Sequence, residues 1–188
     1  MNAERFKLPF GSKVFEPDSE FVRLVYNRPS SCLVAQFVRL MDSQIPVQDL
    51  YYRESSSSNY TKAPKDDRTR SYCEPVSCKG KPYVFFNVFQ WDKSGVGSDW
   101  MSISRLALPD GAVAHLIDKN SLKLPRGCIR GWVSSLLDVN DDGTILTCKV
   151  ALEFATEPNG SWVEYSVRDL NLATGEHKAL VTLPAVFV

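Results

Sequence analysis

The sequence has little of what marks a membrane protein, an exported protein or a nucleic-acid binder. No stretch approaches the roughly 18 consecutive apolar residues that a membrane-spanning helix requires. The first ten residues carry Glu4, Arg5 and Lys7 with no apolar segment behind them, so we see no secretory signal. The 22 basic residues balance 22 acidic ones, and a chain without net charge has no long-range attraction to phosphates or to an anionic bilayer. We therefore expect a cytoplasmic protein whose partner is neither nucleic acid nor membrane.

Patterns for disulfides and metals are missing too. The chain has 5 cysteines, an odd number at irregular spacings, and 2 histidines, His115 and His177, that lie close to no cysteine pair. These spacings predict neither a disulfide framework nor a tetrahedral zinc site. The one tight pair, Cys73 and Cys78, is more simply explained as two small residues flanking a hairpin. We expect no metal and no cofactor.

Catalytic motifs are equally scarce. Asp138, Asn140 and Asp142 precede Gly143 as in the first half of a calcium loop, but Lys149 stands where that loop needs a bidentate carboxylate. We interpret the segment as a tight hairpin in which the glycine has a positive φ. No Gly-x-Ser-x-Gly segment presents a nucleophile. We expect no catalytic residues.

What the sequence does contain is the alternation typical of β-strands. Between residues 144 and 153, apolar residues alternate with more polar ones, which is the period-two pattern of a strand with one buried face. Further strands and turns follow as far as residue 183, so 131–183 is predicted to be a four-stranded antiparallel meander. The residues expected on its buried face are Leu146, Cys148, Val150 and Leu152.

Parts of this meander recur upstream. The residues Ile103, Leu106, Leu108 and Gly111 match Val167, Leu170, Leu172 and Gly175 at a constant offset of 64. A second set, Phe37, Leu40, Val47 and Leu50, matches Ile103, Leu106, Val113 and Leu116 at an offset of 66. A hairpin that recurs three times, each time after an extended apolar run, indicates a repeat of small sheets.

We therefore predict one all-β domain, 1–188, built from antiparallel four-stranded blades. The blades are expected at about 10–53, 70–118 and 131–183, with a flexible interblade loop at 54–67 that is rich in serine and charge. Small meanders that cannot bury both faces alone are the units that a β-propeller stacks around an axis.

The third blade resembles the TolB/PD40-type propeller repeat. The matching residues are Asp142 and Gly143 in the inner hairpin, then 167–175 and 180–181 in the outer hairpin. Blade two matches at 106–111. This resemblance implies a propeller-type architecture, and such repeats occur in interaction proteins, in sugar lyases and beside peptidase domains.

Three blades are fewer than the four to eight in which propellers usually close. Three arrangements remain open: a partial propeller, a ring completed by self-association, and a β-sandwich. In the first two, the apolar tail 184–188 is expected to need a partner surface, since open sheets expose strand edges.

Aromatic residues near predicted strand ends suggest a binding surface. In propellers, the loops at one end gather around the axis, and Trp and Arg there are good anchors for a peptide or a sugar ring. The alternative is that these aromatics fill the space between blades. The candidate residues are Trp91, Asp92, Asp99, Arg130 and Trp132.

We predict a non-enzymatic module that binds a protein or peptide partner, with self-association as a further option. The alternative function is that of a partial propeller from a carbohydrate-active, lyase-like enzyme or a peptidase-associated one, with its catalytic residues elsewhere.

Overall fold

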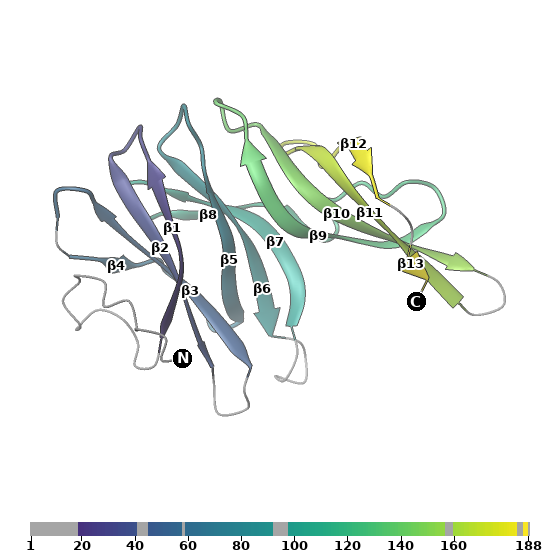
Figure 1. Cartoon of the computed structure of the whole chain (residues 1–188), viewed down its shortest axis with the longest axis horizontal. Coiled ribbons are helices and arrows are strands. Elements are labelled where there is room, and N and C mark those ends of the chain that lie inside the picture. Colours follow the sequence, from purple (N-terminus) through teal and green to yellow (C-terminus); the bar gives the residue numbers. More distant parts are fainter. Residues whose placement is uncertain are drawn as a thin grey trace, which may run out of the picture.

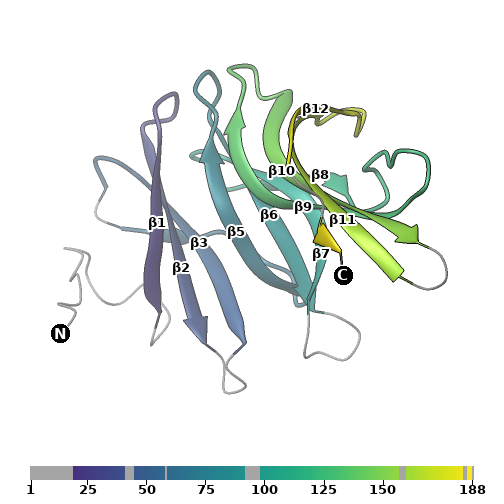
Figure 2. The same ribbon diagram turned by 45° about the vertical axis from the view of Figure 1, so that its right-hand side comes forward.

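The computed structural model describes residues 19–40, 45–57, 59–91, 98–156, 160–183 and 186–187. All regular secondary structure in these residues is β-strand, and the strands form three antiparallel sheets that stand side by side (Figure 1; Figure 2). Sheet one has the order β1(Glu20–Asn27), β2(Cys32–Leu40), β3(Pro46–Glu54), β4(Thr61–Lys62). Sheet two has the order β5(Thr69–Ser77), β6(Tyr83–Trp91), β7(Ser98–Ala107), β8(Val113–Asp118). Sheet three contains β9(Cys128–Val139), β10(Ile145–Thr156), β11(Gly160–Asn171), β12(His177–Thr182) and β13(Val186–Phe187).

The predicted fold class is confirmed: the protein is all-β, and sheets one and two are four-stranded antiparallel meanders. In sheet three, β9 to β12 form such a meander and β13 is a fifth strand that pairs with β11. The hairpins β1–β2, β5–β6 and β9–β10 all turn at the same end of the molecule (Figure 1). Successive strands can pair in this way because short turns join them, and antiparallel pairing requires no long crossover.

The two offsets of the sequence repeat differ in structural meaning. The offset of 64 places β7–β8 on β11–β12, which are the third and fourth strands of sheets two and three. The offset of 66 places β2–β3 on β7–β8, so it joins second and third strands to third and fourth ones. The match at offset 66 was therefore wrong in one respect, since it aligned strands that occupy different positions in their sheets. Amphipathic hairpins of similar length have the same apolar spacing wherever they lie in a sheet, and this explains the match.

Sheet one also reaches further along the chain than predicted. Residues 54–67 were expected to form a loop between blades, but this segment contains β4 and buries Tyr60 and Ala63. Ala63 packs in the core between sheets one and two, whereas Tyr60 packs with Phe37 and Tyr51 in a separate small cluster. These two apolar residues anchor a segment whose composition is otherwise polar.

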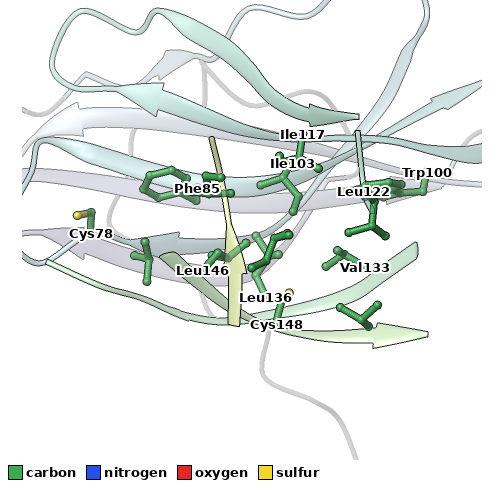
Figure 3. Close-up of a cluster of buried hydrophobic side chains, with 14 of the residues drawn as sticks. Cys78, Phe85, Trp100, Ile103, Ile117, Leu122, Val133, Leu136, Leu146 and Cys148 are labelled. Carbon is green, nitrogen blue, oxygen red and sulfur yellow. The ribbon is translucent and has the colours of Figure 1, made fainter. Parts of the chain in front are cut away.

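Two apolar cores fill the spaces between neighbouring sheets. One core lies between sheets one and two and includes Val34 and Leu50 opposite Phe86. The other lies between sheets two and three, where Figure 3 shows Phe85 and Ile103 facing Leu146. Strand β6 supplies side chains to both cores, and this explains its nearly unbroken apolar sequence.

The predicted register of β10 is confirmed. Its four inward residues have no exposed surface and belong to the core between sheets two and three. The positive φ predicted for Gly143 is confirmed at 74°, and the glycines that match in the repeat, Gly111 and Gly175, also have positive φ values, 77° and 70°.

The chain's last described residues pair with its own third sheet. Val186 is the partner of Val163 and Phe187 is the partner of Trp162, so β12 and β13 both lie along β11. The expectation that this tail needs a partner surface was therefore wrong for these two residues, since their strand pairing is internal. Self-association of the protein stays a prediction.

Two buried cysteines should make the free energy of unfolding decrease at alkaline pH. Burial, reinforced by Glu74 near one thiol and Asp169 near the other, raises the pKa of Cys73 and of Cys148 to about 12. An unfolded thiol loses its proton near pH 8.5. The folded state therefore holds protons that the unfolded state releases, and the free energy of unfolding should fall as pH rises from about 8.5 to 12.

The contribution of one thiol to this slope is about 1.4 kcal/mol per pH unit at most. Urea unfolding at pH 7, 9 and 10 should show a shallower decline for Cys148→Ala than for the wild type. Lys65, whose pKa burial lowers, contributes with the opposite sign, but it is common to both proteins. Parallel slopes in the two proteins would contradict the assignment.

Candidate functional site

An open cavity of about 480 Å³ lies where sheets one and two meet. We call it the basic groove. Strands β2, β3 and β4 of sheet one line it on one side, and the segment from residue 63 to β5 and the end of β6 line it on the other. The residues that give it its chemistry are Arg39, Asp49, Lys62, Lys65, Arg70 and Trp91.

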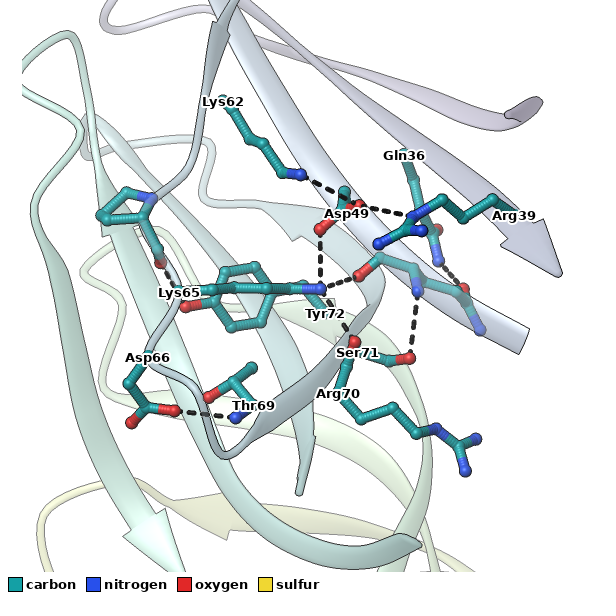
Figure 4. Close-up of polar contacts among 12 residues, drawn as sticks. Gln36, Arg39, Asp49, Lys62, Lys65, Asp66, Thr69, Arg70, Ser71 and Tyr72 are labelled. Carbon is teal, nitrogen blue, oxygen red and sulfur yellow. Dashed lines mark hydrogen bonds and ion pairs between the residues drawn. The ribbon is translucent and has the colours of Figure 1, made fainter. Parts of the chain in front are cut away.

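Asp49 forms the charged centre of the groove. It lies on β3 with only 4% of its surface exposed, and three cations surround its carboxylate (Figure 4). Lys65 Nζ is 2.7 Å from Oδ1, Lys62 Nζ is 3.4 Å from Oδ2 and Arg39 Nε is 4.0 Å from Oδ2. A buried carboxylate is costly unless it is paired, and here the shortest contact, with Lys65, supplies the pair.

Lys65 has a structural role in this arrangement. Besides Asp49, its ammonium donates hydrogen bonds to the carbonyl oxygens of Gln48 and Arg70, so all three of its N–H donors are used. Burial lowers the pKa of Lys65, and the negative charge of Asp49 opposes that change. The ammonium thereby ties β3 to the start of β5.

A turn at Asp66 shapes the floor of the groove. The Asp66 carboxylate accepts hydrogen bonds from the backbone N–H of Arg68 at 3.0 Å and of Thr69 at 2.7 Å. Hydrogen bonding from Thr69 and Arg68 lowers the pKa of Asp66. The backbone N–H groups of Arg68 and Thr69 thus hold this carboxylate in the turn.

Two arginines retain hydrogen-bonding capacity. The Nε atoms of Arg39 and Arg70 are buried and have no hydrogen-bond partner within the described residues. The Arg70 guanidinium lies over the Trp91 ring, 5.8 Å from its centroid. The groove is lined by four basic side chains and three acidic ones, so its formal charge is positive by one.

The predicted site residues that the structure describes lie in two different sheets. Trp91 lines the basic groove, but Arg130 and Trp132 belong to β9 in sheet three. There Arg130 lies 5.0 Å from the Trp132 ring centroid and forms an ion pair of 3.0 Å with Glu153. Asp92 lies outside the described residues. Asp99 lies in β7, but its side chain is also outside them.

Sequence reasoning missed the groove itself. A signal was present in β3, where Asp49 stands beside the apolar residues Val47, Leu50 and Tyr51. A charge in such a strand is seldom buried without a partner. The partners lie on other strands and in the segment 54–67, which was predicted to be a flexible loop.

A serine–histidine cluster in sheet two was also missed. The Ser104 hydroxyl is 2.8 Å and the Ser102 hydroxyl 3.2 Å from His115 Nδ1. Both serines are buried, at 0% and 1% exposure. A nucleophile must reach a substrate carbonyl, which these buried hydroxyls cannot do, so we interpret the cluster as a structural hydrogen-bond network that links the buried serines to the exposed His115.

Within the described part of the chain, no group of three or more His, Cys, Asp or Glu side chains could hold a metal ion. The same residues form no helix that is long and apolar enough to cross a membrane. No protein-family model matches the sequence, and a search of curated proteins finds no significant match.

Proposed function

We propose that the protein is a non-enzymatic interaction module that binds an acidic peptide segment of a partner protein in the basic groove. The observation that carries this proposal is that four basic side chains, from four separate segments of the chain, line one groove. Three meanders that lie side by side agree with a propeller-type module, in which blades serve as a scaffold for binding.

The buried Asp49 explains how such a groove can be positioned before a ligand arrives. Its contacts to Arg39 and Lys62, at 4.0 and 3.4 Å, are longer than the roughly 2.7–2.9 Å of a charge-assisted hydrogen bond. Asp49 thus attracts both cations toward the groove, and Arg39 Nε makes no hydrogen bond within the described residues. A ligand carboxylate could form shorter bonds, and arginine suits this role because its planar fork binds carboxylates with two parallel bonds.

Trp91 adds an apolar surface to this charged site. The indole and the Arg70 guanidinium lie together, so a peptide side chain could contact the ring while an adjacent carboxylate reaches the arginine. An acidic peptide with an aromatic or aliphatic residue beside its acidic residues is the ligand that best matches both features.

The proposal is tested by fluorescence anisotropy with labelled peptides of equal length that are acidic, neutral or basic. The acidic peptide should bind most tightly at low salt and lose affinity as salt screens the charges. Reversing the charge in Arg70→Glu should weaken this binding by about tenfold or more, since buried charge pairs at interfaces contribute strongly.

The matched control is Arg126→Glu, which makes the same change of charge at an exposed position outside the groove. Its affinity should stay close to that of the wild type. Equal losses in the two variants would mean that overall charge, and not the groove, governs binding. Equal affinity for the acidic and basic peptides would also contradict the proposal.

A further inference from the structure

A second cavity, of about 310 Å³, lies where all three sheets converge. We call it the central cavity. Its walls come from β1, β2 and β3 of sheet one, from β5 and β6 of sheet two, and from β9 of sheet three. It shares no lining residue with the basic groove.

Asn87 on β6 is the unusual residue of the central cavity. Its surface is 1% exposed. The carbonyl oxygen Oδ1 is fully enclosed and has no partner. Buried amide groups are almost always paired, so an unpaired Oδ1 in a residue that lines a cavity distinguishes this position from the other polar groups of the cavity.

The other polar groups of the cavity are held in place by their neighbours. Gln36 Nε2 donates a hydrogen bond to Gln48 Oε1. The Glu74 carboxylate accepts hydrogen bonds from Ser135 Oγ at 3.0 Å and from the backbone N–H of Leu136 at 2.8 Å. Because of these contacts, the groups that line the cavity are positioned before any ligand binds.

The backbone at Glu74 has an unusual conformation beside the central cavity. Glu74 has a φ of 53°, which is rare for a residue other than glycine, and it lies in an irregular part of β5, between Cys73 and Val76. This conformation carries its carboxylate across to β9 of sheet three. Strained backbone concentrates at functional sites, and here it joins two sheets beside the unpaired amide.

We propose that the central cavity binds a neutral sugar. The cavity carries one positive group, Arg23, and one negative group, Glu74, so neither a cation nor an anion is favoured by net charge. The amides of Asn87, Gln36 and Gln48 can each donate and accept, and neighbouring hydroxyl groups on a sugar ring do the same. Phe89 supplies an apolar wall for the C–H face of the ring.

The proposal is tested by titrating the full chain with glucose, galactose, mannose and N-acetylglucosamine and following the backbone amide signals by NMR. At least one sugar should shift the signals of Asn87 and Phe89 in a saturable way. Asn87→Leu keeps the branched shape and the number of heavy atoms of the side chain but removes both hydrogen-bonding groups, and it should weaken that binding by about tenfold or more.

Arg23→Ala changes an exposed residue at the cavity's edge and keeps the test decisive if Asn87→Leu does not fold. It too should weaken sugar binding, whereas Arg70→Ala in the basic groove should leave it unchanged. Absence of any saturable shift would overturn the proposal and leave a water-filled cavity. So would equal sugar affinity in the wild type and in the Asn87 or Arg23 variant, or tighter binding of glucuronate than of glucose. None of these results depends on whether the groove binds acidic peptides.

Discussion

Gly175→Ala should lower the free energy of unfolding by about 3 kcal/mol or more. Gly175 has a φ of 70°, and a left-handed conformation costs a residue with a Cβ atom about 1–2 kcal/mol. A Cβ atom there would also lie 1.9 Å from the backbone carbonyl oxygen of Ser121, in the segment that precedes β9. Backbone cannot swing aside as a side chain can, and such overpacking costs a further 1–3 kcal/mol or so.

Gly127→Ala is the matched control for this variant. Gly127 has a similar φ of 83°, but a Cβ atom there would meet nothing within 4 Å. Its substitution should therefore cost only the conformational part, about 1 kcal/mol. Urea unfolding of the purified variants measures both values, and equal losses would show that the close approach to Ser121 does not matter.

Lys65→Met should be the most damaging substitution in the basic groove. It removes the closest counter-ion of the buried Asp49 and the two hydrogen bonds that Lys65 donates to the carbonyl oxygens of Gln48 and Arg70. Removing one partner from a buried ion pair typically costs about 3–5 kcal/mol, because the other charge stays buried. Chemical denaturation at neutral pH measures this loss.

Two control variants distinguish the loss of the Asp49–Lys65 ion pair from the loss of a lysine in general. Lys123→Met removes an ammonium that lies 2.8 Å from Glu176, but both of these side chains are more than half exposed, so its effect should be much smaller. The double variant Asp49→Leu, Lys65→Met removes both charges and should regain part of the stability lost in the single one. Equal losses in Lys123→Met and Lys65→Met would refute the structural role of the pair.

The sequence predicted those parts of the fold that depend on neighbouring residues. The register of β10 followed from the alternation of Leu146, Cys148, Val150 and Leu152 with polar residues, because one buried face requires that period. The turn at Gly143 followed from the Asp-Gly pair. Both features are local, and local patterns can be recognised without knowledge of the rest of the chain.

The sites could not be predicted in the same way. The basic groove joins Arg39, Asp49, Arg70 and Trp91, which come from four strands of two sheets. Nothing in the spacing of these residues reveals that the sheets meet there. The pairing of β13 with β11 was missed for a related reason: an apolar tail looks the same whether it pairs with its own sheet or with another chain.

The two cores share sheet two, and this has a consequence for how the protein comes apart. Loss of sheet one or of sheet three uncovers one face of its neighbour, whereas loss of sheet two would uncover both outer sheets at once. In a row of units that contact only their neighbours, the ends open at a lower cost than the middle. We expect subglobal opening to begin at either end of the row. The central cavity lies where all three sheets meet, so opening at either end would also dismantle one of its walls.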